Sequence, residues 1–274
     1  MGVGLIRFCL LIAVLLAAKG AVAQRIEFVR LNRELIEQRL REVPKKDPLR
    51  KDKISALFEQ AGCKAGLSEQ PVKGQRLPNV ICTLQGSGDS VILVGAHFDH
   101  AAAGDGIADN WSGVVLLPAL YESLAQHPRK HSFVFIAFTA EEQGLLGSRY
   151  YAKHMAAEEV ARTRAMVNLD TMGLSSTKVW ASRADKNLLD ALRRVANAID
   201  LPLAGVNVER VGSTDAESFA PLKIPRIAIH SVTQGTFPIL HSPFDNLRAL
   251  KLDEYYDSYR LVATYLAYLD GVLD

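Results

Sequence analysis

The sequence predicts an α/β fold: a mixed, largely parallel central sheet sandwiched between helices. Two continuous apolar runs, at 91–96 and 133–138, are typical of strands buried on both faces, and a third strand is expected at 165–169. Segments with helical character alternate with them, at 111–126 and 186–199 among others. The 274 residues can form one large core, and no repeat or linker divides them, so we expect a single domain over 24–274.

The first 23 residues predict a signal peptide. Arg7 precedes an unbroken apolar run from Phe8 to Ala18, and Ala21-Val22-Ala23 has the small-x-small form that a signal peptidase cuts. The run is short for a membrane span, and an uncut N-terminal anchor is the alternative interpretation. No later segment is apolar enough to cross a membrane. We therefore expect an exported protein, periplasmic or extracellular, that has no membrane contact after cleavage.

The charge balance argues against polyanionic partners. The leader carries Arg7 and Lys19 and no acid, so the mature chain has 30 basic and 30 acidic residues. A net charge near zero gives no reason to expect nucleic acid or an anionic membrane surface as a partner. The sequence shows no inserted lid or dimerisation domain, so a monomer is expected.

The N-terminal third of the mature chain predicts two helices and then a hairpin. Apolar residues at helical spacing predict the first helix over 27–42, and a second ends near Ala61 before Gly62. Strand-like segments follow at 64–72 and 78–85. The other elements expected along the chain are a helix at 144–154, strands at 179–181 and 224–229, and a closing helix at 251–272.

Two cysteines stay in the mature chain, because Cys9 leaves with the signal. Cys63 and Cys82 lie near the two arms of the predicted hairpin, and export would place them in an oxidising compartment. A disulfide is the preferred interpretation, and two buried thiols are the alternative. A cysteine zinc site would need more ligands at closer spacing.

Acidic residues and histidines collect where the predicted strands end. In a sheet of this class, ligands bind outside the carboxyl ends of the strands. A cluster of His, Asp and Glu without cysteine suits zinc or a similar divalent ion. The residues concerned are His97, Asp99 and His100 after the first buried strand, Asp105 and Asp109 in the next loop, Glu141 and Glu142 after the second strand, Asp170 after the third, and His241 in a late loop.

The spacing of these residues suggests how they could share the work. His97 and Asp99 are two apart on an extended segment and point the same way, so the carboxylate could orient the imidazole. Glu141 and Glu142 are adjacent and point differently, so one could bind metal while the other moves a proton. A carboxylate such as Asp109 could bridge two ions.

Two positions compete for these roles. Asp105 is an alternative to Asp109, but it lies between two glycines, which favours a turn. His230 ends a predicted strand and is an alternative to His241; the residues alone leave that choice open.

Five segments together resemble a known family. "GAHFDH", "GIADNWSGV", "FTAEEQGLLGS", "NLDTMG" and "HSPFDN" are similar, in order and spacing, to the motifs of the co-catalytic dizinc aminopeptidases, a family that also contains the glutaminyl cyclases. The resemblance is close over 79–247 and looser elsewhere. It implies the zinc-exopeptidase fold, a mixed sheet between helices, which agrees with the elements predicted above.

The resemblance also implies a role for each of seven residues and two zinc ions as cofactors. His97 and Asp170 would hold one zinc, Glu142 and His241 the other, and Asp109 both. Asp99 would orient His97, and Glu141 would be the general base. The ligand set would also accept cobalt or manganese.

This chain departs from the family pattern in two places. His100 follows the H-x-D pair, where the family often has a small residue. The family segment S-D-H-x-x-F appears as Thr214 to Phe219 without its histidine, which leaves the metal set intact but affects the substrate pocket.

The expected function is an exported zinc aminopeptidase that hydrolyses the N-terminal bond of peptides with a free N-terminus. One alternative is a glutaminyl-peptide cyclotransferase with a single zinc, although those enzymes usually carry a tryptophan where this chain has Leu240. Another is an inactive relative that binds peptides. A serine hydrolase is disfavoured, because there is no G-x-S-x-G elbow. The sequence does not determine the preferred first residue or the accepted peptide length. A dipeptidase is therefore one of the alternatives.

Overall fold

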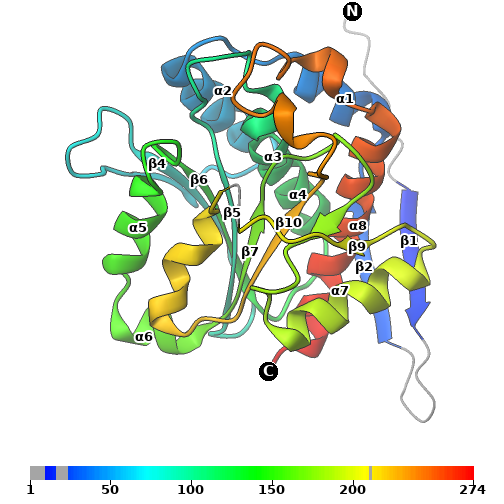
Figure 1. The fold of residues 1–274 in the computed structure, drawn as a ribbon. Coiled ribbons are helices and arrows are strands. Elements are labelled where there is room, and N and C mark those ends of the chain that lie inside the picture. Colours follow the sequence, from blue (N-terminus) through cyan, green and yellow to red (C-terminus); the bar gives the residue numbers. More distant parts are fainter. Residues whose placement is uncertain (1–9, 17–23, 210–211) are drawn as a thin grey trace, which may run out of the picture.

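The computed structural model describes residues 10–16, 24–209 and 212–274. Within these residues the main sheet has eight strands, and its four central strands run parallel in the order β6-β5-β7-β10 (Figure 1). Antiparallel strands extend it on both sides, so the mixed, largely parallel sheet is confirmed. In spatial order the strands are β3 (Leu67–Gln70), β4 (Asn79–Leu84), β6 (Ser132–Phe138), β5 (Val91–His97), β7 (Thr163–Leu169), β10 (Arg226–His230), β8 (Lys178–Val179) and β9 (Ala204–Gly205).

Strand β5 is apolar throughout because both faces of the sheet are covered. All seven of its residues are buried. Ile92 and Val94 pack into the larger core cluster, whereas Val91 and Leu93 pack into the smaller one on the opposite face. Successive side chains of a strand point to opposite faces, so a run without polar residues fits two cores.

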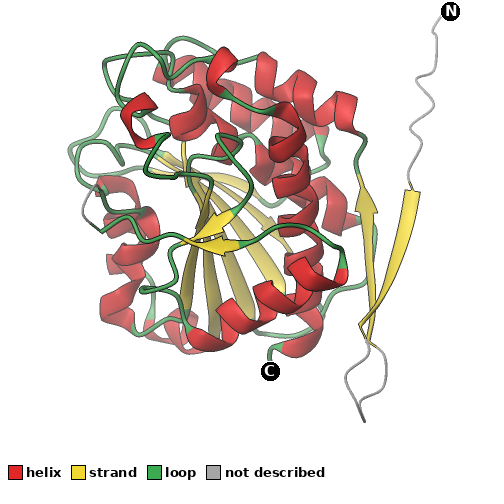
Figure 2. Cartoon of the chain, turned by 45° about the vertical axis from the view of Figure 1, so that its right-hand side comes forward, coloured by secondary structure: helices red, strands yellow, loops and turns green. Residues whose placement is uncertain are grey.

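Helices cover the two faces unequally (Figure 2). The larger face carries α2 (Asp47–Gln60), α3 (Ser112–Val114), α4 (Leu116–Ala125), α7 (Lys186–Ala198) and α8 (Leu252–Val272), with α1 (Arg33–Arg41) packed on α8. The smaller face carries α5 (Leu146–Lys153), α6 (Ala157–Arg162) and the 3₁₀ segment η2 (Asp215–Leu222). Three short turns complete the chain: η1 (Ile107–Trp111), η3 (Phe237–Ile239) and η4 (Leu247–Ala249).

The prediction of one helix over 27–42 is wrong in its first part. Strand β2 (Gln24–Arg30) pairs antiparallel with β1 (Leu10–Leu16), and the helix begins only at Arg33. Ile26 and Phe28 are two apart and both buried, which is strand spacing. Asn32 then accepts a hydrogen bond from the backbone N–H of Leu35 at 2.9 Å and caps the helix.

The predicted signal peptide stays a prediction. Its cleavage site at Ala21 to Ala23 lies outside the described residues, and so does most of the leader. In the part of the chain that is described, no helix has the length and apolar character needed to span a bilayer.

A disulfide joins Cys63 to Cys82. Cys63 lies just before β3, and Cys82 lies in β4, its antiparallel partner. The hairpin that was predicted to bring the two cysteines together is therefore present. Helix α6 was not predicted; it has no buried residue that would reveal a periodic apolar face.

Candidate active site

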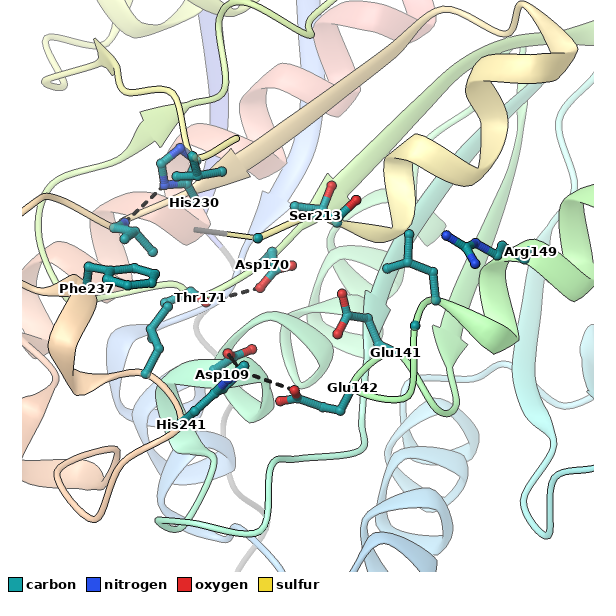
Figure 3. Close-up of a pocket in the computed structure, with 17 residues that line it drawn as sticks. Asp109, Glu141, Glu142, Arg149, Asp170, Thr171, Ser213, His230, Phe237 and His241 are labelled. Carbon is teal, nitrogen blue, oxygen red and sulfur yellow. Dashed lines mark hydrogen bonds and ion pairs between the residues drawn. The ribbon is translucent and has the colours of Figure 1, made fainter. Parts of the chain in front are cut away.

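Five of the residues singled out in the sequence meet at the carboxyl edge of the parallel strands. His97 is the last residue of β5, Asp170 follows β7 directly, and Glu142 lies in the loop after β6. Asp109 comes from η1, and His241 comes from the loop after η3 (Figure 3). Segments far apart in sequence therefore supply one cluster, because parallel strands bring their carboxyl ends to the same edge.

Asp109 lies between the two histidines. Its Oδ1 is 3.2 Å from His97 Nε2, and its Oδ2 is 3.2 Å from His241 Nε2. His241 Nε2 is also 3.1 Å from Glu142 Oε2, and His97 Nε2 is 3.9 Å from Asp170 Oδ1. The donor atoms form two neighbouring groups that could each hold a cation: His97, Glu141 and Asp170, and Asp109, Glu142 and His241.

Asp99 connects the first strand end to the loop of the two glutamates. His97 Nδ1 forms its hydrogen bond with the backbone carbonyl oxygen of Asp99, at 3.1 Å, and the carboxylate Oδ1 of Asp99 lies 3.6 Å from the same nitrogen. The two carboxylate oxygens of Asp99 also accept hydrogen bonds from the backbone N–H groups of Glu141, at 3.0 Å, and Glu142, at 3.1 Å. The sequence suggested the contact with His97, but not the contacts with the two amides, which depend on the neighbouring strand.

Asp245 holds the loop that carries Asp109. One of its carboxylate oxygens accepts from the backbone N–H groups of Ile107, at 2.9 Å, and Ala108, at 2.7 Å, and the other accepts from that of Asp109, at 3.1 Å. Sequence reasoning missed this role, although Asp245 lies inside the segment "HSPFDN". Its distance of more than 130 residues from Asp109 hides the contact.

Asn110 ties the Asp109 loop to the end of β7. Its side-chain amide donates to the carbonyl of Leu169 at 2.9 Å, and its oxygen accepts from the N–H groups of Thr171 and Gly113, each at 3.0 Å. The positions of Asp109 and Asp170 are thus linked through one buried side chain.

Left-handed backbone conformations concentrate around the site. Ala140, Thr171 and His241 have φ of 53°, 57° and 53°, and Leu145 has 61°. Such conformations are costly for non-glycine residues and are found where the surrounding contacts impose them. Ala140 precedes the glutamates, Thr171 follows Asp170, and His241 is itself a candidate ligand.

Burial dominates the acid–base properties of the carboxyl groups. It raises the pKa of Glu141 to about 10, with further contributions from Asp215, Asp170 and Asp109 and opposition from His97. Burial likewise raises the pKa of Asp170 to about 7 and that of Glu142 to about 6. These groups crowd into a small volume, so each disfavours the charge of the next.

The histidines and Asp109 shift in the opposite sense. The hydrogen bond to Asp109 raises the pKa of His241 to about 9. Burial opposes the charge on His97, but Glu141 and Asp109 raise its pKa well above the usual value. The pKa of Asp109 falls although burial opposes this, because His241 and His97 hydrogen-bond to it. A divalent cation would lower the carboxyl pKa values and displace the histidine protons.

The cluster fits a divalent cation. Glu142 Oε1 is buried and has no hydrogen-bond partner among the described residues. The two groups together contain four carboxyl groups and two imidazoles and no cysteine. Carboxylates and imidazoles are the usual ligands of hydrolytic zinc sites. Asp109 offers one oxygen to each side, as a carboxylate between two ions would.

A cavity of about 340 Å³ opens beside the cluster. Its apolar wall consists of Leu145, Val208, Val232, Phe237 and Leu240. The polar residues around it include Arg149, Ser213, Thr214 and His230 (Figure 3). A ligand of the size of a short peptide could reach the cluster from this side.

The competing residues lie outside the cluster. Asp105 is exposed, and its backbone carbonyl accepts a hydrogen bond from the buried Arg50. His230 lies in the cavity wall, where its Nε2 donates to the carbonyl of Val206 at 3.0 Å. His100, at the departure from the family pattern, pairs with Asp47 at 2.6 Å. Neither histidine belongs to the two ligand groups.

The altered family segment contributes a buried acid behind the cluster. Asp215 is fully buried, and its carboxylate oxygens accept no hydrogen bond of ordinary geometry from the described residues, although Ser148 lies close enough to lower its pKa. Burial has the larger influence and raises the pKa of Asp215 to about 7.

Comparison with known sequences places these residues in a family context. A sequence model of peptidase family M28 matches residues 79–266. The "probable leucine aminopeptidase 2" of Aspergillus oryzae is 39% identical over 170 residues, which is 57% of this chain and 34% of that protein. The chain therefore spans about a third of the length of this relative.

Solved structures agree on the fold. A zinc aminopeptidase from Bacillus subtilis superposes with a TM-score of 0.64 at 25% identity, covering 71% of this chain and 50% of that one. The glutaminyl cyclase of Porphyromonas gingivalis superposes with a TM-score of 0.68 at 20% identity, covering 85% of this chain and 95% of that one. The second likeness concerns the fold alone.

Proposed function

The chain belongs to peptidase family M28, and on that premise we propose that it is an exported zinc aminopeptidase that removes the first residue of peptides with a free N-terminus. The observation that carries the proposal is the position of Asp109, whose two oxygens face the two candidate ligand histidines, His97 and His241, at 3.2 Å each. This arrangement supports a pair of metal ions sharing one carboxylate.

Five side chains would hold the metal. We assign His97 and Asp170 to one zinc, Glu142 and His241 to the other, and Asp109 to both. When bound, two zinc ions would polarise the peptide carbonyl and make a water molecule acidic enough to attack it. Asp99 would keep His97 oriented, and its bonds to the two glutamate amides would keep their loop in place.

Glu141 would act as the general base. It lies close to His97 and Asp170. Its carboxylate does not belong to the other ligand group, which consists of Asp109, Glu142 and His241. Its side chain would take a proton from the attacking water and deliver it to the nitrogen of the leaving residue. Glu142, the next residue, faces His241 instead, so the two neighbouring glutamates can serve different functions.

The surroundings of the cluster support an N-terminal substrate. The carboxylates near the cavity favour the positively charged amine of a free N-terminus. Four residues of the apolar wall, Val208, Val232, Phe237 and Leu240, would accommodate an apolar first side chain. We therefore expect leucine-like first residues to be preferred over charged ones.

A cyclase or an inactive peptide-binding protein would differ in measurable ways. A glutaminyl cyclase would need a single zinc and would cyclise an N-terminal glutamine. The residue before His241 is Leu240, which contributes to the apolar wall, where the cyclases usually carry a tryptophan. An inactive relative would bind peptides without turnover.

The test is metal-dependent release from a panel of aminoacyl amides and short peptides. Metal-free protein should release no N-terminal residue from these substrates, and adding zinc should restore the release. The active protein should bind two zinc ions per chain. A glutamine-initiated peptide is included in the panel. Cyclisation of that peptide without release from the others would move the chain to the cyclase branch, and silence on both would favour a binding protein.

Export is tested separately. When the full-length precursor is expressed, the protein should be recovered outside the cytoplasm with Gln24 as its first residue, if cleavage follows Ala23. Recovery of uncleaved protein in the membrane fraction would favour an N-terminal anchor.

A further inference from the structure

Arg149 is a cation at the cavity for which the described residues provide no side-chain partner. It lies in the first turn of α5 and is exposed, and its side chain lines the same cavity as Glu141, in the same half of the view in Figure 3. Among the described residues it makes no side-chain hydrogen bond or ion pair, and no other lysine or arginine lines the cavity. An arginine whose guanidinium has no side-chain partner among the described residues can bind a negatively charged ligand, such as a carboxylate.

Backbone hydrogen bonds fix Arg149 relative to Glu141. The N–H groups of Gly144 and Leu145 both donate to the carbonyl of Glu141, each at 2.8 Å. The N–H of Arg149 then donates to the carbonyl of Leu145 at 2.9 Å. The guanidinium is thus carried by a short, hydrogen-bonded unit that begins at the proposed general base.

This position corresponds to the leaving side of the substrate. Glu141 is proposed to return its proton to the leaving nitrogen, so the second residue of the peptide must lie beside Glu141. Phe237 lies across the cavity, on the side of His241 (Figure 3), and Leu240, which also lines the cavity, directly precedes His241 in the chain. The first side chain and the leaving residue therefore meet different walls.

We propose that Arg149 binds a carboxylate carried by the second residue of the substrate, which makes the enzyme selective for dipeptides. In a dipeptide the C-terminal carboxylate follows the scissile bond by one residue, which is the first anion that a cation beside the leaving side can meet. An acidic side chain at the same residue offers the same chemistry. The inference rests on the proposed aminopeptidase function.

The charges around the cavity are compatible with such an anion. Bound zinc ions would offset the negative charge of the four carboxyl groups in the lining, Asp109, Glu141, Glu142 and Asp170. His230 in the wall is neutral, because burial lowers its pKa to about 4. Arg149 is therefore the cationic side chain that the described lining offers to a substrate carboxylate on the leaving side.

The kinetic test compares three substrates: Leu-Gly, Leu-Gly amide and Leu-Asp amide. The wild-type enzyme should cleave Leu-Gly with a kcat/KM roughly tenfold higher than Leu-Gly amide, mainly through KM, because a charge-assisted hydrogen bond at an exposed site is worth about that much. Arg149→Gln should remove the preference, and Arg149→Lys should restore part of it.

Lys153→Gln is the matched control. Lys153 lies one turn further along α5, is also exposed and does not line the cavity. This variant removes the same charge from the same helix and should keep the full preference. Comparing both variants on identical substrates also cancels the difference in amine pKa between a dipeptide and its amide.

The outcomes separate the two sources of the carboxylate. A preference for Leu-Gly that depends on Arg149 establishes the C-terminal carboxylate. If Leu-Asp amide alone gains from Arg149, the arginine reads an acidic side chain and dipeptide selectivity is overturned. Equal kcat/KM for all three substrates in wild type and Arg149→Gln overturns the inference while the aminopeptidase function stands.

A binding measurement covers the case in which no peptide is hydrolysed. Calorimetry with Leu-Gly and Leu-Gly amide is performed on Glu141→Gln and on the double variant Glu141→Gln, Arg149→Gln. Tighter binding of Leu-Gly that disappears in the double variant supports the role of Arg149 even if the proposed hydrolysis fails. Identical binding of both ligands to both proteins overturns it.

Discussion

The carboxylate of Asp245 accepts a hydrogen bond from the backbone N–H of Asp109 at 3.1 Å. The same carboxylate also accepts from the two preceding amides, so it fixes the backbone from which the central acid of the cluster projects. Asp245 is 1% exposed, and water cannot easily replace it. The precision of the cluster therefore depends on a residue that is not itself a ligand.

Replacing Asp245 by asparagine should weaken zinc binding. The asparagine NH₂ group would face backbone N–H groups, and at least one buried donor would lose its acceptor. By analogy with other residues that support metal ligands, zinc affinity should fall roughly 10- to 100-fold. Competition with a chelator measures this, with Asp190→Asn on α7 as the control. Unchanged affinity in Asp245→Asn would refute the positioning role.

Replacing Glu141 by glutamine should strongly reduce turnover but keep the metal. The amide cannot accept the proton of the attacking water, and we expect kcat to fall by roughly 10²–10⁴. The zinc content, measured by inductively coupled plasma mass spectrometry, should stay at the wild-type value because the proposed ligands are unchanged. Near-normal turnover would end the assignment of Glu141 as general base.

Replacing Asp109 by asparagine should reduce the zinc stoichiometry. A neutral amide offers one good acceptor atom instead of two, so it cannot serve both ligand groups. We expect fewer than two zinc ions per chain, with circular dichroism unchanged. Asp105→Asn is the control, since Asp105 is exposed and outside the cluster. Loss of zinc in Asp105→Asn but not in Asp109→Asn would exchange their roles.

His230 should make stability depend on pH. Its Nδ1 accepts from the N–H of Val232 at 3.1 Å, so the ring proton sits on Nε2, which donates to Val206. Protonating Nδ1 would bring two donors together. Burial lowers the pKa of His230 from 6.5 to about 4 in the folded protein. Below pH 6.5 the unfolded chain takes up a proton that the folded chain refuses, so stability falls with decreasing pH.

The expected size of this effect is about 1.4 kcal/mol of unfolding free energy per pH unit between pH 6 and 4.5. Denaturant unfolding of wild type and His230→Gln across this range measures it. Glutamine stays neutral, so the difference between the two proteins should shrink as the pH falls. Parallel pH profiles would show that His230 titrates normally.

The disulfide should stabilise the mature protein. Cys63 and Cys82 are 19 residues apart, and closing a loop of this length in the unfolded chain is worth about 3 kcal/mol. The double variant Cys63→Ala, Cys82→Ala should unfold at lower denaturant concentration and keep its zinc content, because neither cysteine lies in the cluster. Equal stability of reduced wild type and oxidised wild type would contradict this.

Much of the sheet could be predicted because central strands are recognisable from their own apolar residues. Val91 to Ala96 and Phe133 to Phe138 contain no polar residue, and both faces of β5 and β6 are in fact covered. The N-terminal helix was misplaced for the converse reason. Phe28 and Leu31 fit helical spacing, whereas Ile26 and Phe28 fit strand spacing, and the packing of β2 against α4 and α8 decided for the strand.

The candidate site shows the same division. His97, Asp109 and Asp170 could be selected from the sequence because they follow strands whose ends must meet at one edge. The contacts of Asp245 and Asn110 could not, because a carboxylate or amide that binds backbone groups leaves no local pattern. Arg149 was overlooked as well: an arginine on a helix is ordinary until its surroundings are known.

The sequence by itself determined the fold class, the set of candidate ligands and the family, because apolar periodicity and the order of short motifs are properties of the chain. Only the tertiary structure decided that Asp109 stands between His97 and His241 and that Arg149 shares their cavity. These relations depend on backbone paths between distant segments. Those paths are set by packing and by hydrogen bonds between segments that are distant in sequence, such as the bonds that the carboxylate of Asp245 accepts from the backbone at Asp109.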